Sequence, residues 1–166
     1  MTGVQTCALP IFLLHSHAGG TVVTSMHTDR KALGHIAKVV GARALIVNYR
    51  RSPEHKFPAQ IDDIERAYRW LLARGIRPQN VASTGHSVGG NLAVSLAVTL
   101  RGKGVPLPAA ILSVSPWYDM EAKNETLDSN AETDALITRA SLEMLDRKST
   151  RLNSSHRSLS RMPSSA

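Results

Sequence analysis

The stretch STGHSVGG at residues 83–90 decides the fold, because it places a serine between two glycines at the junction of two apolar segments. Residues 80–84 before it are predicted to form a strand, and residues 91–100 after it are apolar nearly all round, like a buried helix. A Gly-x-Ser-x-Gly pattern in this context is typical of a nucleophile elbow, a sharp and strained turn that exposes the serine hydroxyl. The pattern therefore predicts that Ser87 is a catalytic nucleophile. The alternative is that both glycines merely pack the helix on the strand.

The other apolar segments alternate between strand-like and helix-like patterns. Strands are predicted at 11–16, 43–49, 80–84 and 109–115. Helices are predicted at 29–40, between Pro58 and Gly75, at 91–100, and at 133–145 with Thr133 as the cap. Strands that alternate with helices favour an α/β fold, with a mostly parallel sheet and helices on both of its faces.

A second stretch, LLHSHAGG at residues 13–20, follows the first predicted strand and supplies what a lone serine lacks. Attack on an ester carbonyl builds negative charge on its oxygen. Backbone N–H groups must already point there, and each is worth about 3 kcal/mol. Glycine lets the main chain approach a ligand closely. We therefore expect the amides of Gly19, Gly20 and Val88 to form an oxyanion hole, and His17 to position its loop.

Four motifs carry a resemblance to a known family. They are HAGG at 17–20, YRRSPEHKFPAQIDD at 49–63, GHSVGG at 85–90 and SPWYD at 115–119. In this order they resemble the motifs of the hormone-sensitive-lipase-like esterases of the α/β-hydrolase superfamily, over about residues 11–145. The resemblance implies a partial α/β-hydrolase fold and hydrolysis of short-chain carboxylic esters through an acyl-enzyme. It implies neither a metal nor an organic cofactor.

The chain departs from the family pattern at three motif positions. Ala18 replaces the first glycine of the family's H-G-G-G, His86 replaces an aspartate beside the nucleophile, and Arg51-Ser52 replaces Leu-Ala. By analogy with the family, the first glycine is not one of the donating pair. We expect all three changes to tune the site rather than abolish it.

The family's catalytic acid and histidine follow strands that come well after the SPWYD motif. Here the recognisable sequence stops near Leu145, and His156 is the only histidine after Ser87. We therefore expect the other two members of the triad beyond Leu145. As a partial domain with exposed sheet edges, the chain is expected to be almost inactive and prone to aggregate.

Both ends of the chain lack an apolar pattern. Residues 1–10 and 147–166 resemble translated sequencing-adapter sequence, so the predicted domain spans 11–146 and the tail is expected to be disordered. A natural disordered tail is the alternative. The tail holds five basic residues and no acid, which leaves 15 basic and 13 acidic residues elsewhere. Without the tail, the net charge of +7 therefore falls to +2.

Composition excludes several classes of protein. A near-neutral domain with few aromatic residues argues against a nucleic-acid partner. The single cysteine excludes an internal disulfide, and no apolar run is long enough to span a membrane. No signal peptide is recognisable, so a cytoplasmic location is the default expectation. The expected partner is a small ester, and the sequence does not indicate an oligomeric state.

Other chemistry-bearing residues leave alternatives open. His15 and His17 would share one face of a strand but lack a third ligand for a metal. His86 adjoins the nucleophile, yet neighbouring side chains diverge at an elbow, which disfavours it as the general base. Asp119 follows the fourth strand, where some α/β hydrolases carry their acid. A second functional class is a non-catalytic module that binds a small ligand on the same fold, as in the plant gibberellin receptors.

Overall fold

Four parallel strands form the centre of the computed structural model, in which residues 11–150 are described. The strands are β1 (Phe12–Ser16), β2 (Arg43–Val47), β3 (Val81–His86) and β4 (Ala110–Val114). Their order in the sheet is β2-β1-β3-β4, and each neighbouring pair is parallel. The predicted parallel sheet is therefore confirmed, and the carboxyl ends of all four strands lie at the same end of the sheet.

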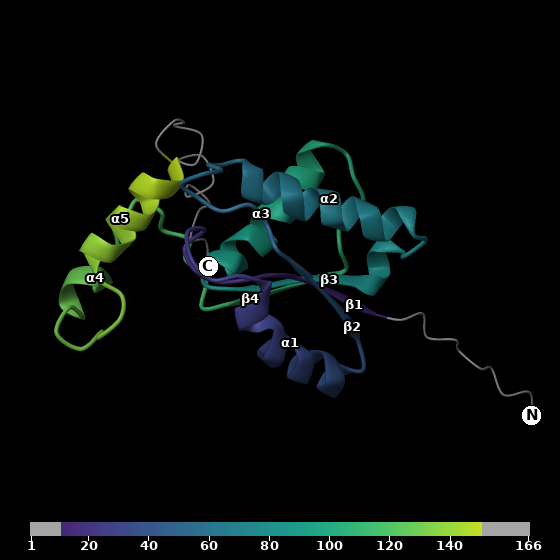
Figure 1. Ribbon diagram of the computed structural model, residues 1–166, viewed down its shortest axis with the longest axis horizontal. Coiled ribbons are helices and arrows are strands. Elements are labelled where there is room, and N and C mark those ends of the chain that lie inside the picture. The colour runs from purple at the N-terminus through teal and green to yellow at the C-terminus, as the bar shows by residue number, and fades with distance from the viewer. Residues whose placement is uncertain (1–10, 151–166) are drawn as a thin grey trace, which may run out of the picture.

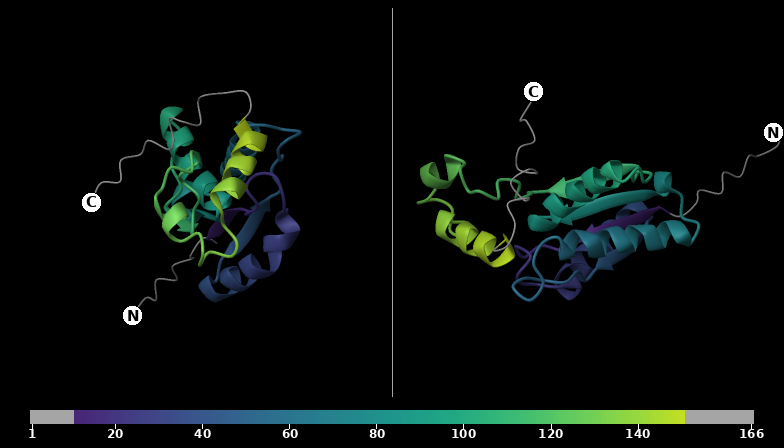
Figure 2. Two further views of the ribbon diagram at one scale, coloured as in Figure 1. Left: turned by 90° about the vertical axis from the view of Figure 1, so that its left-hand side faces the viewer. Right: turned by 90° about the horizontal axis from the view of Figure 1, so that it is seen from above.

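Helices cover both faces of this sheet, as the sequence predicted. They are α1 (Met26–Val40), α2 (Ala59–Ala73), α3 (Val88–Gly102), α4 (Thr126–Ser129) and α5 (Arg139–Thr150), with a 3-10 turn at Pro78–Asn80 before β3. Figure 1 shows α1 on one face of the sheet and both α2 and α3 on the other. Figure 2 shows α4 and α5 beyond one end of the sheet, outside these two layers. None of the helices within residues 11–150 has the length and apolar character needed to cross a membrane.

The core follows from side chains that alternate along β1. Leu14 is buried with Tyr68 and Leu96 in the larger apolar cluster, between the sheet and the α2–α3 layer. Leu13, one residue earlier, belongs to a smaller cluster with residues of α1. All five residues of β1 are buried, which is typical of a central parallel strand.

Helix α1 begins three residues earlier than the apolar pattern predicted. Ser25 caps it, because its side chain accepts a hydrogen bond from the helix backbone while Thr28 reaches back to the Ser25 amide. This arrangement is a capping box. Gly41 ends the helix with a left-handed φ of 65°, as expected from its position.

The last helix differs more from the prediction. The carboxylate of Asp134 accepts hydrogen bonds from the amides of Leu136 and Ile137, so this segment forms a turn instead of a first helical turn. Thr138, not Thr133, takes the capping position, since its hydroxyl accepts from the Ser141 amide. The predicted cap was therefore wrong. Helix α5 also continues to Thr150, four residues beyond the expected domain boundary. The rest of the tail and residues 1–10 lie outside the described residues.

Strand β4 lies at an edge of the sheet and is poorly covered by other elements. It pairs with β3, yet Ile111, Leu112 and Val114 stay exposed, with 48% of Leu112 accessible to solvent. A parallel strand normally buries both of its faces. This edge of the sheet therefore presents apolar surface, in agreement with the expectation of an exposed edge.

Candidate active site

Ser87 lies at a sharp turn between β3 and α3. Its backbone has a φ of 57° and a ψ of −125°, a conformation that is strained for any residue with a side chain. The Ser87 amide donates to the Val114 carbonyl (3.0 Å), and the Ser87 carbonyl accepts from the amides of Gly90 (3.0 Å) and Trp117 (3.2 Å). The strained conformation expected of an elbow is present, and contacts on both sides hold it.

The two glycines of the elbow are required by space. A Cβ on Gly85 would lie 2.0 Å from the Gly89 carbonyl oxygen, across the turn. A Cβ on Gly89 would lie 2.0 Å from the Ser16 carbonyl oxygen at the end of β1. The first clash lies within the turn itself, whereas the second arises because α3 packs closely on the neighbouring strand.

The segment between β1 and α1, residues 17–25, is called the glycine loop here, and it leaves the sheet beside the elbow. Ser16, the last residue of β1, is in register with Gly85 of β3. The glycine loop and the elbow therefore start at the same end of the sheet. Gly19 and Gly20 have positive φ angles of 102° and 60°. The amides of Val22 and Val23 donate to the Gly19 carbonyl (3.0 and 2.9 Å), which closes a tight turn. On the other side of the elbow, Val88 is the first residue of α3, so its amide has no acceptor within the helix.

His17 is completely buried at the start of this loop. Its Nδ1 donates to the Ala18 carbonyl (2.8 Å), and its ring stacks on Tyr49 with centroids 4.0 Å apart. Burial lowers the pKa of His17, so its imidazole is neutral near neutral pH. Nε2 is buried and finds no hydrogen-bond partner among residues 11–150. The His17 side chain therefore packs between the glycine loop and Tyr49.

The segment after β2 braces the same loop. The Tyr49 hydroxyl donates to the His17 carbonyl (2.8 Å), and burial raises the pKa of this phenol well above its usual range. Arg51 donates from Nη1 to the Thr24 carbonyl, and the Ser52 amide donates to the Thr21 carbonyl (2.8 Å). The Arg51 departure from the family pattern therefore supplies a side-chain contact to this loop, whereas the Ser52 contact comes from a backbone amide that an alanine would also donate.

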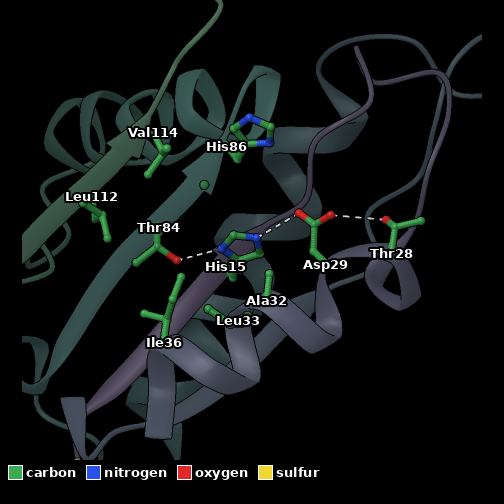
Figure 3. A pocket seen from close by; sticks show the side chains of 11 residues that line it. His15, Thr28, Asp29, Ala32, Leu33, Ile36, Thr84, His86, Leu112 and Val114 are labelled. Atoms are coloured by element: carbon green, nitrogen blue, oxygen red, sulfur yellow. Dashed lines mark hydrogen bonds and ion pairs between the residues drawn. The ribbon is translucent and has the colours of Figure 1, made fainter. Parts of the chain in front are cut away.

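A charged network adjoins the other side of the loop. His15 contacts Thr84 Oγ1 through Nδ1 (2.9 Å) and Asp29 Oδ2 through Nε2 (3.0 Å). The same Asp29 oxygen accepts a hydrogen bond from the Ala18 amide (3.2 Å). Burial alone would raise the pKa of Asp29, but the hydrogen bonds from His15 and Ala18 together hold it below its ordinary value. Figure 3 shows the part of this network that runs from Thr84 through His15 and Asp29 to Thr28. These four residues line a cavity of about 200 Å³.

Sequence reasoning did not identify Asp29 or Thr24 as part of the site. Asp29 was placed only as the start of a predicted helix, and Thr24 lies in what was predicted as loop. The signal for Asp29 is its position four residues after the capping Ser25, which puts its carboxylate in the first turn of α1, near the end of β1. No sequence signal marks Thr24. Its role depends on the turn at Gly19, which brings the Thr24 hydroxyl to the Ala18 carbonyl (2.6 Å).

The remaining candidates do not join Ser87 in a catalytic arrangement among the described residues. His86 is exposed, and Figure 3 shows its ring near the cavity lined by His15. The Asp119 carboxylate accepts a hydrogen bond from the Asn124 amide (2.8 Å). Within residues 11–150, no cluster of three or more His, Cys, Asp or Glu side chains could hold a metal ion.

The parallel sheet, the strained serine between β3 and α3 and the glycine loop after β1 define an α/β hydrolase architecture. The family described as "alpha/beta hydrolase fold" matches residues 13–163. The chain belongs to this family, and within it to the group that resembles hormone-sensitive lipase.

Two curated relatives and one solved structure illustrate the similarity. An acetyl-hydrolase from Streptomyces hygroscopicus is 35% identical over 80% of this chain and 44% of its own length. An ethyl acetate hydrolase from Pseudomonas putida is 40% identical over 69% of this chain and 38% of its own length. The crystal structure of an esterase from the bacterial hormone-sensitive lipase family is 44% identical, covers 84% of this chain and 46% of that one, and superposes with a TM-score of 0.80. The chain thus spans less than half the length of these relatives.

Proposed function

We propose that the protein hydrolyses carboxylic esters and that Ser87 is its nucleophile. Ser87 Oγ attacks the ester carbonyl carbon and passes its proton to a histidine base. That proton then goes to the departing alcohol as the carbon–oxygen bond breaks, which leaves an acyl-enzyme. Water, activated by the same base, forms the acid and restores the serine. We propose that the base and its acid partner follow Leu145, in keeping with the chain order of the family. The strained Ser87 elbow is the observation that carries the proposal.

The second part of the proposal is that the amides of Gly19, Gly20 and Val88 bind the oxyanion. The register between β1 and β3 supports it, because it starts the glycine loop and the elbow at adjacent strand ends. The positive end of α3 adds favourable potential at the same place. His17 acts as a positioning residue, since it holds the Ala18 carbonyl and contacts no reacting atom.

The substrate class proposed is esters with short acyl chains. Val88, Leu92 and Met120 are among the residues that line a small cavity beside the first turn of α3. The Leu145 side chain from α5 lies so close to Gly20 that a Cβ there would be 2.8 Å away. Space around the glycine loop is therefore narrow, and the named activities of two relatives concern acetyl groups.

Covalent labelling of the full chain tests the nucleophile. An ethyl fluorophosphonate probe, followed by intact mass and peptide mapping, is expected to label Ser87 slowly, because no histidine among residues 11–150 is placed as its base. Ser87→Ala should abolish this labelling. Ser115→Ala is the matched control, since Ser115 also follows a strand, has a positive φ of 41° and is exposed. Labelling that survives Ser87→Ala and is lost in Ser115→Ala would refute the assignment.

Turnover is tested in a chimera that joins residues 11–150 to the remaining part of the bacterial esterase of known structure. This chimera is expected to hydrolyse p-nitrophenyl acetate, and its Ser87→Ala variant to lose the activity. A soluble, folded chimera that binds short esters without cleaving them would instead support the ligand-binding alternative.

A further inference from the structure

Ala18 is held on both sides of its backbone by side chains from three other segments. Its amide donates to Asp29 Oδ2 (3.2 Å) in the first turn of α1. Its carbonyl accepts from His17 Nδ1 (2.8 Å), from the Thr24 hydroxyl (2.6 Å) and, at 3.4 Å, from the Tyr49 hydroxyl. These contacts fix the peptide planes before and after Ala18.

The second of these planes contains the Gly19 amide. A trans peptide is planar, and its N–H points opposite to its C=O. Anchoring the Ala18 carbonyl against His17 and Thr24 therefore turns the Gly19 N–H away from them. The orientation of one proposed oxyanion donor thus depends on how Ala18 is held.

The first plane is held at its two ends, by Asp29 at the Ala18 amide and by the Tyr49 hydroxyl at the His17 carbonyl (2.8 Å). Glycine backbones adopt many conformations, and both residues after Ala18 have positive φ angles, so the loop has little stiffness of its own. A carboxylate forms a stronger, charge-assisted hydrogen bond to an amide than a neutral acceptor does. The position of Asp29 in the first turn of α1 also favours its ionised form, because the helix dipole is positive there.

His15 fixes the carboxylate itself. His15 on β1 is in register with Thr84 on β3, and its ring bridges the Thr84 hydroxyl and Asp29. The Thr28 hydroxyl contacts the other Asp29 oxygen (3.2 Å). Figure 3 shows Thr84, His15, Asp29 and Thr28 in a row across the two strands and the start of α1. The carboxylate is thus tied to the rigid centre of the sheet.

We propose that Asp29, aligned by His15, is a positioning residue that orients the oxyanion loop through the Ala18 amide. It touches no substrate and takes no proton in the reaction. The proposal rests on the proposed function, because it gives the loop its role. The hydrogen bond from the Ala18 amide to Asp29, called the clamp below, can be measured without any reaction.

The first test is amide exchange with solvent in the isotope-labelled full chain, followed by nuclear magnetic resonance. In Asp29→Ala, the Ala18 amide is expected to exchange at least about tenfold faster than in the wild type, since a lost hydrogen bond of about 1.5 kcal/mol corresponds to that factor. Asp62→Ala is the matched control: Asp62 is also in the first turn of a helix but is exposed and far from this network in sequence. Its Ala18 exchange should match that of the wild type.

The second test is the rate at which the fluorophosphonate probe modifies Ser87. Asp29→Ala is expected to lower the maximal rate about tenfold or more while the probe concentration at half-maximal rate stays unchanged, because the loop binds the developing charge and not the free probe. Asp29→Asn keeps one acceptor oxygen for the Ala18 amide. It should therefore recover part of the rate, and it serves where Asp29→Ala does not fold.

Three outcomes separate the possibilities. Unchanged Ala18 exchange in Asp29→Ala would overturn the clamp. A labelling rate that falls equally in Asp29→Ala and Asp62→Ala would show a general helix effect and overturn the positioning role. Absence of Ser87 labelling in the wild type would refute the proposed function, while the exchange measurement would still decide the clamp.

Discussion

The region from β1 to α3 and the region from β4 to α5 differ in how completely they are packed. In the first, β1 is buried along its whole length and the glycine loop is tied to α1, to β3 and to the segment after β2. In the second, most of β4 is exposed, and α4 and α5 lie beyond the end of the sheet (Figure 2). The proposed nucleophile and oxyanion donors all belong to the first region.

This difference indicates that the proposed site is built by the better-packed region. The second region contributes backbone contacts, since the Val114 carbonyl and the Trp117 amide hold Ser87. Substitutions in the first region should therefore change stability and reactivity strongly, whereas equivalent substitutions in the second should do little. The leucine and tyrosine pairs below test that contrast, whereas the glycine pair tests the close packing inside the first region.

The largest effect is expected at the contact between α3 and β1. Gly89→Ala places a methyl group 2.0 Å from the Ser16 carbonyl oxygen, and neither backbone can move without disturbing the sheet. We expect a loss of more than about 3 kcal/mol in the free energy of unfolding, or failure to fold. Gly102→Ala, at the far end of the same helix, meets no atom within 4 Å and should be neutral or stabilising by up to about 1 kcal/mol. Urea unfolding of both variants measures the contrast.

The second pair compares two leucines. Leu96 is fully buried between α3 and the sheet, so Leu96→Ala should cost about 3 kcal/mol through lost burial and a new cavity. Leu112 on β4 is exposed, so Leu112→Ala should change the free energy of unfolding by less than about 0.5 kcal/mol. Comparable losses in the two variants would contradict the difference in packing. Light scattering is expected to show less self-association in Leu112→Ala, because apolar surface is removed from a sheet edge.

The third pair compares two tyrosine hydroxyls, and a smaller loss of stability is expected from only one of them. Tyr49→Phe removes the donor to the buried His17 carbonyl and should cost about 1 kcal/mol, with slower labelling of Ser87. Tyr118→Phe removes only a solvent-exposed contact between its hydroxyl and that of Ser113 on β4 (2.9 Å). It should leave both the free energy of unfolding and the labelling rate unchanged. Equal effects of the two substitutions would show that the Tyr49 hydroxyl does not brace the loop.

The smallest effect concerns pH. Because burial lowers the pKa of His17 in the folded chain, the unfolded state binds its proton more readily. The contribution of this residue to stability is therefore complete above its ordinary pKa of about 6.5 and declines as the pH falls below that value. His17→Phe keeps a ring against Tyr49 but cannot titrate. Its melting temperature should fall less steeply than that of the wild type as the solution is acidified from neutral pH.

Local patterns in the sequence were sufficient to predict the sheet and the elbow. Glycines on either side of Ser87 and apolar strands before and after it are short-range signals, and the four strands and the first three long helices lie where these signals place them. The start of α5 was missed because Asp134 and Thr138 form local turns that compete with the helix. A weak apolar pattern cannot register such competition.

The supports of the glycine loop could not be predicted in the same way. Asp29, Thr24 and Ala18 are brought together by the register of β1 with β3 and by the capping of α1, which no single motif encodes. Whether the amides at 19, 20 and 88 converge on the Ser87 hydroxyl likewise depends on distances across two connections. The proposed oxyanion hole requires this convergence.

A crystal structure of the chain with an ethyl phosphonyl group on Ser87 tests this claim most directly. The phosphonyl oxygen imitates the oxyanion of the tetrahedral intermediate. We predict that this oxygen lies about 2.7–3.1 Å from the amide nitrogens of Gly19, Gly20 and Val88. A phosphonyl oxygen that points to solvent, with these amides bonded elsewhere, would contradict it.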